Sequence, residues 1–291
     1  MGRKRLLLFA LAGLVSVVLL SLRKERRSVV GCGWPVNLAH RGASARAPEN
    51  TLEAFRLAVE SGAGGLELDV HLTRDGHVVV IHDPTLDRTT DGTGAVAKMT
   101  LDELRELDAG HNFTPDGGNV FPYRGLGLRI PTLAEVLGEF PGVAVNIDMK
   151  VDRPGIEVAV LDALREADAE ERALVVSSRR GAVRRFRRIS GGRISTGASR
   201  LETGVFFLLS NLRLGRLLRP AYDALQVPVR HRGIPLVTRR FIDSAHDRNV
   251  RVDAWTINET DEMRRLLALG VDVIMTDSPE TLAEVLAHRE Q

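Results

Sequence analysis

The sequence has almost no cysteine, since Cys32 is the only one in 291 residues. A disulfide framework is therefore excluded, and no cluster of cysteine and histidine suggests structural zinc. No internal repeat or low-complexity tract is present. Apolar residues make up 44% and charged residues 27% of the chain, which is typical of a globular protein. The length suits one large domain with a small additional segment.

The main part of the chain is not basic either, although the sequence pI is about 9.0. Residues 1–27 hold seven basic side chains against one glutamate, a balance of +6, whereas the whole chain carries only +2. Everything after residue 27 therefore sums to −4, and we expect no nucleic-acid partner.

One long apolar run, Leu6 to Leu22, lies between two clusters of arginine and lysine. As a helix it reaches about 26 Å, the short end of what spans a bilayer core. We predict a single-pass membrane anchor over 1–33, followed by one domain over 34–291. A cleaved signal or lipoprotein segment and a buried core helix are the alternatives, and the basic cluster after the run argues against cleavage. Basic residues are balanced on the two flanks, so they predict no side of the membrane.

From residue 36 onward, short β-rich runs alternate with amphipathic helical stretches. This alternation and the domain length favour a (β/α)8 TIM barrel. The predicted strands are 36–40, 66–71, 77–82, 143–148, 173–177, 193–196, 223–227, 250–256 and 271–275. The predicted helices are 51–61, 132–139, 155–167, 179–190, 203–219, 239–248, 259–269 and 279–288.

Nine strands are one too many for this barrel, and a hairpin explains the surplus. No residues remain between the second and third strands for a crossover, and Asp75-Gly76 is a strong signal for a two-residue hairpin loop. With that loop, Asp69 lies opposite His82, and eight parallel strands remain. The long connection at about 84–131 contains a predicted capped helix at 100–107, and its length indicates a lid or binding loop.

Polar residues gather where the predicted strands end, at the barrel mouth that carries active sites. His40 closes the first strand, and Glu67 and Asp69 on the second point the same way because they are two residues apart. Paired carboxylates repel unless a cation or proton intervenes, and oxygen ligands favour Mg²⁺, Ca²⁺ or Mn²⁺. Asp148 can complete the set, and Lys150 can meet a phosphate as a point charge. Each residue alone fits a structural role, but their convergence favours a site.

The same residues resemble the signature of the glycerophosphodiester phosphodiesterase family. The resemblance covers about residues 36–288 and implies a phospholipase-C-like TIM barrel. The matching motifs are His40-Arg41-Gly42, Glu49-Asn50-Thr51, Glu67-Leu68-Asp69-Val70, Thr73 through Asp83, Trp255-Thr256-Ile257-Asn258, Gly270-Val271-Asp272 and Met275-Thr276-Asp277.

The resemblance also implies roles for individual residues. It implies His40 and His82 as general acid and base without dividing the two steps between them. It further implies Glu67, Asp69 and Asp148 as metal ligands, Arg41, Lys150 and Trp255 as phosphate or substrate contacts, and Glu49 as a supporting or ligand acid.

The chain departs from the family pattern at Asp148, where the third ligand is usually glutamate. Aspartate is one methylene shorter, so the ion or the strand must shift, or water must fill the gap. The N-I-D-x-K form at 146–150, the N-terminal apolar run and the apolar segment Val205 to Leu218 resemble the membrane-bound lysophospholipase D branch. That segment is either a core-facing outer helix or an interfacial helix against lipid. Of the remaining histidines, His71 is two residues after Asp69 and is therefore expected to point to the same side of the strand.

We therefore predict a membrane-anchored, metal-dependent hydrolase that cleaves glycerophosphodiesters to glycerol 3-phosphate and an alcohol. One alternative is a lysophospholipase D that releases lysophosphatidic acid, with lysophospholipid as substrate and membrane lipid as a partner. Another is a catalytically silent lipid-binding barrel, and a lyase or aldolase on the same fold is a third. No pattern indicates an oligomeric state.

Overall fold

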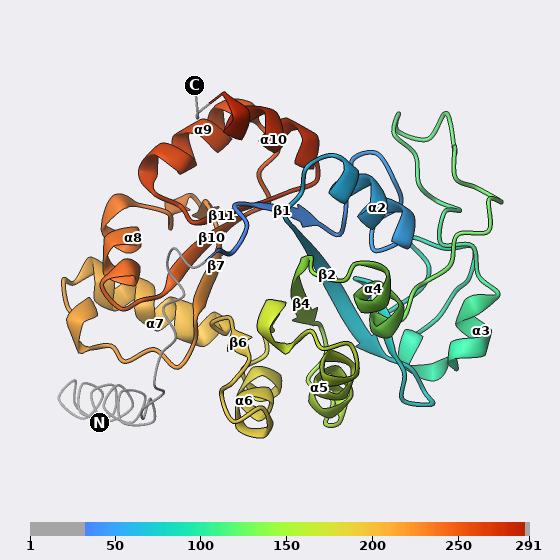
Figure 1. Cartoon of the computed structure of the whole chain (residues 1–291), viewed down its shortest axis with the longest axis horizontal. Helices are drawn as coiled ribbons and strands as arrows, with labels where there is room; N and C mark the ends of the chain where they lie inside the picture. The colour runs from blue at the N-terminus through green and yellow to red at the C-terminus, as the bar shows by residue number, and fades with distance from the viewer. Residues whose placement is uncertain (1–32, 289–291) are drawn as a thin grey trace, which may run out of the picture.

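The computed structural model describes residues 33–288, and these residues form a TIM barrel that is nearly closed (Figure 1). Its eight parallel strands run in the spatial order β6-β5-β4-β2-β1-β11-β10-β7. Their bounds are Asn37–His40 (β1), Gly65–Leu72 (β2), Ala144–Met149 (β4), Ala173–Val176 (β5), Ser195–Thr196 (β6), Ala224–Pro228 (β7), Arg251–Trp255 (β10) and Val273–Thr276 (β11). A single parallel bridge between Gly197 and Ala224 joins the two outer strands of this order. The predicted count of eight parallel strands is confirmed.

Helices between the strands form the outer layer, as βα alternation requires. They are α2 (Leu52–Glu60), α4 (Leu133–Glu139), α5 (Ile156–Glu166), α6 (Arg180–Ile189), α7 (Arg200–Asn211), α8 (Arg239–His246), α9 (Thr260–Leu269) and α10 (Pro279–Ala287). The helix predicted at 203–219 instead ends at Asn211, and a 3-10 turn, η3 (Gly215–Leu217), follows it. Arg213, with φ of +60°, lies between the two and breaks the helical path.

The predicted hairpin exists, but its register differs by one residue. β2 pairs antiparallel with β3 (Val78–Val80), and His71 lies opposite Val79. The loop therefore has three residues, Arg74 to Gly76. A loop of this length needs one residue in the left-handed region, and Gly76 supplies it with a φ of +91°. The prediction that Asp69 lies opposite His82 is wrong: Ile81 takes that place and donates its N–H to the Asp69 carbonyl at 2.9 Å.

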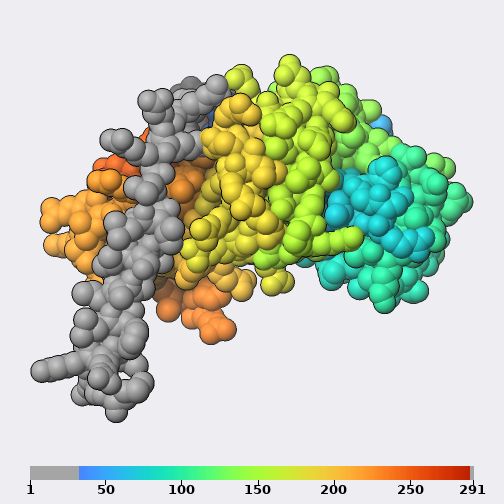
Figure 2. Space-filling view, turned by 90° about the horizontal axis from the view of Figure 1, so that it is seen from below, coloured from blue at the N-terminus to red at the C-terminus, as the bar shows by residue number. Residues whose placement is uncertain are grey.

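The insertion at 84–131 is an ordered layer with its own apolar cluster beside the hairpin. That cluster includes Val79, Leu86, Leu104 and Ile130, all almost fully buried. The predicted capped helix appears as α3 (Leu101–Arg105), and Thr100 and Glu103 form a reciprocal capping box. Viewed from below, α5 and α6 occupy the middle of the surface, and the insertion forms one end (Figure 2). Four shorter elements complete the order: η1 (Val96–Lys98), η2 (Glu170–Arg172) and the paired strands β8 (Arg230–His231) and β9 (Ile234–Pro235).

Trp34 closes the end of the barrel at which the strands begin. Its side chain packs against two apolar clusters inside the barrel, one containing Leu38 and Met275 and the other Leu174. The guanidinium of Arg251, the first residue of β10, lies 4.1 Å from the centre of the indole. This end of the barrel, the floor, is therefore packed, and the opposite end, the mouth, carries the polar residues.

Gly42 gives the first prediction, because it packs the end of β1 against α2 in a conformation that suits glycine. Its φ is +86°, and a Cβ added there would lie 2.7 Å from the backbone of Ala54. We expect Gly42→Ala to lower the free energy of unfolding by about 2 kcal/mol or more, measured by chemical denaturation. Gly138→Ala is the control, because Gly138 lies exposed in α4 with open space around it and should gain about 0.5–1 kcal/mol. Equal stabilities for the two variants would contradict this account.

Candidate active site

Three adjacent strands, β1, β2 and β4, place His40 and the predicted acids side by side at the mouth. The strand registers pair His40 with Glu67 across β1 and β2, and Asp69 with Asp148 across β2 and β4. The side chains of Glu67 and Asp69 are almost completely buried, at 5% and 0% exposure. The prediction that Glu67 and Asp69 point to the same side of β2 is confirmed, since the residue between them, Leu68, lies in the apolar layer under the helices.

Two cations neutralise these buried carboxylates. The Lys150 ammonium lies 2.7 Å from Asp69 Oδ1 and 2.6 Å from Asp148 Oδ2. Arg41 contributes its Nε, 3.2 Å from Asp69 Oδ2, and its backbone N–H, which donates to Glu67 Oε2 at 3.1 Å. The structure therefore brings these five residues together, as the sequence predicted.

The local charges divide the acids into two kinds. Burial first, and then the charge of Asp69, raises the pKa of Glu67 to about 7. Burial also raises the pKa of Asp69, but Lys150 and Arg41 outweigh it, so that the pKa of Asp69 is lowered. The His82 imidazole acts on Asp69 in the same direction, which places its ring within electrostatic reach of the carboxylates.

His40 is held in place by the segment after the last strand. Its Nδ1 lies 2.7 Å from Asp277 Oδ1, which also accepts the Ser44 hydroxyl at 2.9 Å. Asn258 donates to the other oxygen of Asp277 at 2.7 Å. Burial lowers the pKa of His40, but the hydrogen bond to Asp277 and the charge of Glu67 outweigh this effect and raise the pKa overall.

His82 reaches the mouth despite the shifted hairpin register, because β3 ends at Val80 and the chain turns there. The buried His71 ring fixes this turn: its Nε2 lies 3.0 Å from the His82 carbonyl oxygen. The His82 Nδ1 lies 2.6 Å from Asp83 Oδ1. Each predicted acid–base histidine therefore has a carboxylate partner that fixes its ring.

Glu49, for which the resemblance implied a supporting or ligand role, pairs with two arginines. Its Oε1 accepts Arg41 Nη1 at 2.9 Å, and Arg88 binds both of its oxygens at 2.7 Å. The pKa of Glu49 is lowered because these bonds outweigh its burial. Asp83 behaves in the same way: burial opposes the bonds from Arg88 and His82, and its pKa falls to about 2.

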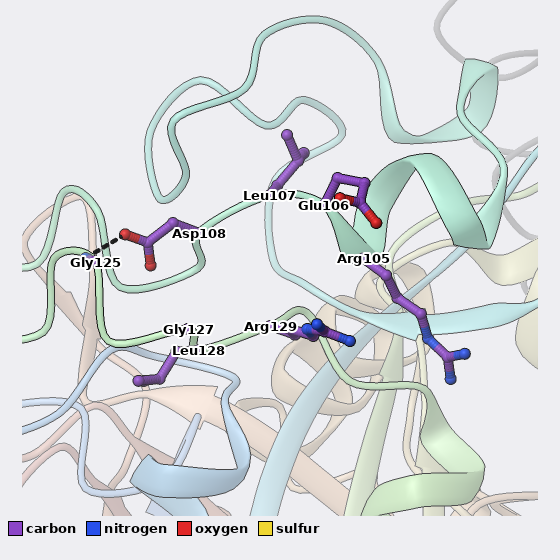
Figure 3. A pocket seen from close by; sticks show the side chains of 8 residues that line it. All are labelled: Arg105, Glu106, Leu107, Asp108, Gly125, Gly127, Leu128 and Arg129. Atoms are coloured by element: carbon purple, nitrogen blue, oxygen red, sulfur yellow. Dashed lines mark hydrogen bonds between the residues drawn. The ribbon is translucent and has the colours of Figure 1, made fainter.

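Trp255 ends β10 and is 41% exposed, although it is a large aromatic side chain. The role of Trp255 against substrate, which the resemblance implied, stays a prediction. A separate hollow of about 230 Å³ lies on the insertion, lined by residues such as Arg105, Asp108 and Leu128 (Figure 3). None of the predicted site residues lines it, and it does not coincide with the active site.

The predicted metal ion requires a set of oxygen donors at the mouth. Within residues 33–288, no three His, Cys, Asp or Glu side chains are arranged to hold an ion. The carboxylate oxygens of Glu67, Asp69 and Asp148 are nevertheless the type of ligand that a hard divalent cation prefers. Asp148 Oδ1 is buried and accepts no hydrogen bond, and Asp148 lies beside Asp69 in the register of β2 and β4. Lys150 and Arg41 supply the compensating charge in this arrangement.

Sequence reasoning assigned no role to Asp277, Asp83, Arg88 or Asn50. Asp83, Asp277 and Asn50 lie inside the quoted motifs, and for Asp83 the neighbouring His82 was the available signal. Asn50 donates to Asp69 Oδ2 at 2.9 Å and accepts the Asp69 N–H. Arg88 carried no signal, because its partners come from different segments of the chain.

Two imidazoles with carboxylate partners, three acids and two cations at the mouth of a TIM barrel form a site that can bind a phosphate and exchange protons with it. The sequence pattern of the Glycerophosphoryl diester phosphodiesterase family matches residues 40–281. The chain is 38% identical to a glycerophosphodiester phosphodiesterase of Caldanaerobacter subterraneus over 86% of this chain and 96% of the relative. It is 33% identical to one of Bacillus altitudinis over 85% of this chain and 96% of the relative.

Solved structures agree with these relatives. A phosphodiesterase of Oleispira antarctica, solved in complex with the product sn-glycerol-3-phosphate, superposes with a TM-score of 0.66 at 28% identity, over 86% of this chain and 96% of that one. A glycerophosphoryl diester phosphodiesterase domain from Mycobacterium tuberculosis shares the fold, with a TM-score of 0.74 at 24% identity over 87% and 99% of the two chains. The chain belongs to the glycerophosphoryl diester phosphodiesterase family and is a phosphodiesterase.

Asp277 gives a prediction about pH. Hydrogen bonds from His40 and Asn258 outweigh its burial and lower its pKa from 3.8 to about 2. A lowered carboxyl pKa stabilises the folded state above about pH 4, and this stability is lost as the pH falls towards 2. We expect the free energy of unfolding of Asp277→Asn to fall less steeply between pH 4 and 2 than that of the parent. Asp261→Asn, which changes a fully exposed side chain, is the control and should follow the parent. Parallel curves for all three proteins would refute the assignment.

Proposed function

We propose that this phosphodiesterase uses a divalent cation to hydrolyse glycerophosphodiesters to glycerol 3-phosphate and an alcohol. The two fixed imidazoles beside the buried acids support this proposal best, because phosphodiester hydrolysis needs one proton acceptor and one proton donor. The product named for the Oleispira relative supports the glycerol phosphate half of the substrate. All the residues that the chemistry requires are present, which disfavours a silent lipid-binding barrel.

In this mechanism the phosphate binds against Arg41 and Lys150. One imidazole takes the proton of the attacking oxygen as that oxygen bonds to phosphorus. The other gives its proton to the alkoxide as the bond from phosphorus to the alcohol breaks. Asp277 and Asp83 hold the two rings in position for these transfers. A cation bound by Glu67, Asp69 and Asp148 would polarise a non-bridging phosphate oxygen and neutralise its charge.

The attacking oxygen is either water or a hydroxyl of the glycerol, which would first close a cyclic phosphate. A substrate analogue without that hydroxyl separates the two routes. Unchanged turnover excludes the cyclic route, and lost turnover with intact binding supports it.

The metal and His40 are tested together with glycerophosphocholine as substrate and choline release as the measurement. We expect a chelator to abolish turnover and added Mg²⁺, Ca²⁺ or Mn²⁺ to restore it. His40→Ala should lose about 10²–10⁴-fold in kcat with metal present. His77→Ala is the matched control, because His77 lies exposed at the hairpin turn. Turnover that survives the chelator contradicts the metal, and an active His40→Ala contradicts the role of His40.

The alternative activity, lysophospholipase D, is favoured by one surface. Leu201 and Leu208 on α7, Leu212 directly after it and Leu217 in η3 are each at least half exposed. The basic residues Arg213, Arg216 and Arg219 are exposed beside them. Apolar side chains beside arginines suit an interface with anionic lipid. Choline release from lysophosphatidylcholine and glycerophosphocholine, measured side by side, separates the two activities.

Membrane attachment is likewise a proposal. The predicted anchor lies in residues 1–32, outside the described part of the chain. Between residues 33 and 288, no helix combines the length and apolar character needed to cross a membrane. The exposed leucines and arginines of α7 and η3 are the support that the described residues offer.

This surface is tested with protein lacking residues 1–32 and vesicles that contain anionic lipid. We expect binding that weakens with salt, because arginines near an anionic surface contribute about 1 kcal/mol each. Leu208→Glu with Leu212→Glu should reduce the bound fraction several-fold. Val158→Glu is the control, because Val158 is 48% exposed on a different helix, α5. Equal binding of both variants would show that α7 does not contact lipid.

A further inference from the structure

Arg88, in the insertion, links two carboxylates that serve different parts of the active site. Its Nη1 and Nη2 donate to the two oxygens of Glu49, each at 2.7 Å. Its Nε donates to Asp83 Oδ2 at 2.5 Å. A guanidinium satisfies two carboxylates at once because its donors form a planar fork, which the point charge of lysine does not provide.

Each of these carboxylates in turn holds a group at the mouth. Asp83 fixes the His82 ring at 2.6 Å, and Glu49 fixes the Arg41 guanidinium at 2.9 Å. Arg41 then reaches Asp69, the most deeply buried acid of the site. An unbroken series of contacts therefore runs from an imidazole to the phosphate-binding arginine, and Arg88 is its central member.

The backbone around Arg88 is fixed on both sides. Leu86 is buried, and its N–H donates to the Gly94 carbonyl at 3.0 Å. Thr85 and Ala95 form an antiparallel bridge, and the Asn112 amide donates to the carbonyls of Asp87 and Thr90. Arg88 is therefore presented by a braced turn, although its side chain is 47% exposed.

We propose that Arg88 is a positioning residue that sets the orientation of His82 and Arg41 together. The proposal rests on the roles proposed above for those two residues. Without the guanidinium, Asp83 and Glu49 lose the cation between them, and the imidazole and the phosphate-binding arginine each lose one support. Exposed ion pairs contribute little to stability, so the contribution of Arg88 lies in orientation and its loss should appear in catalysis.

The test measures glycerophosphocholine hydrolysis by the full chain. Because outer partners of active-site groups contribute about 10–100-fold to activity, we expect Arg88→Met to lower kcat/KM by that factor with little change in Tm. Arg88→Lys should restore only part of the loss, since it keeps the charge and loses the fork. Guanidinium ion at concentrations far below denaturing should partly restore Arg88→Ala. Arg105→Met is the matched control, because Arg105 forms an ion pair with Glu135 in the same layer, away from the mouth.

Double-mutant cycles separate the two arms of the proposal. Asp83→Asn should lower kcat through His82, and Glu49→Gln should raise KM through Arg41. When either is combined with Arg88→Met, the loss of kcat/KM should be smaller than the product of the two single losses. Arg88→Met within twofold of the parent, or effects that simply multiply, overturns the proposal. His82→Ala is assayed in parallel: if it keeps full turnover, the proposed mechanism fails. If it is inactive while Arg88→Met is unaffected, only the role of Arg88 fails.

Discussion

The mouth of the barrel depends on the contact between the Lys150 ammonium and the carboxylates of Asp69 and Asp148. Three acids on adjacent strands are held out of water, and desolvating charges costs several kcal/mol per ion unless a partner compensates it. Lys150 lies within 2.7 Å of two of them, and Arg41 reaches the third through its backbone N–H. The cations that we propose for phosphate binding therefore also allow the acids to be buried together. In this proposal, substrate binding and folding depend on the same two positive charges.

The two imidazoles of the site are supported by different parts of the fold. His40 belongs to a barrel strand and is held by Asp277, which follows the last strand, so its support comes from the barrel itself. His82 follows the hairpin and is held by Asp83, whose other partner lies in the insertion. The 84–131 segment is thus part of the active-site framework, and its apolar cluster packs on the hairpin that carries His82.

Much of this fold could be read from the sequence, because periodicity and turn chemistry act locally. Alternating strands and helices gave the eight-stranded barrel, and side-chain parity placed Glu67 and Asp69 on one face. The register of the hairpin could not be read in the same way, because the left-handed conformation of Gly76 fits a two-residue or a three-residue loop. The geometric reason predicted for the position of His82 was wrong, since the contact with His71 and the end of β3 direct it to the mouth.

Two of the residues that sequence reasoning did not identify have partners that are distant along the chain. Asp277 meets His40, and Arg88 meets Glu49, across separations that no local pattern encodes. The departure at Asp148 is similar. Its shorter side chain was expected to leave a gap, and the structure shows one oxygen bonded to Lys150 and the other buried without a hydrogen-bond partner. Spacing identifies which side chains face the mouth, but only the packed strands determine which of them touch.

Trp34 has a mechanical consequence. It stacks on Arg251 and lies between two apolar clusters at the floor. A force applied to the chain at Trp34 would therefore act first on the floor, the end of the barrel opposite the mouth. Residues of several strands, such as Leu38 of β1, Leu174 of β5 and Arg251 of β10, would share the load, and none of them belongs to the proposed active site.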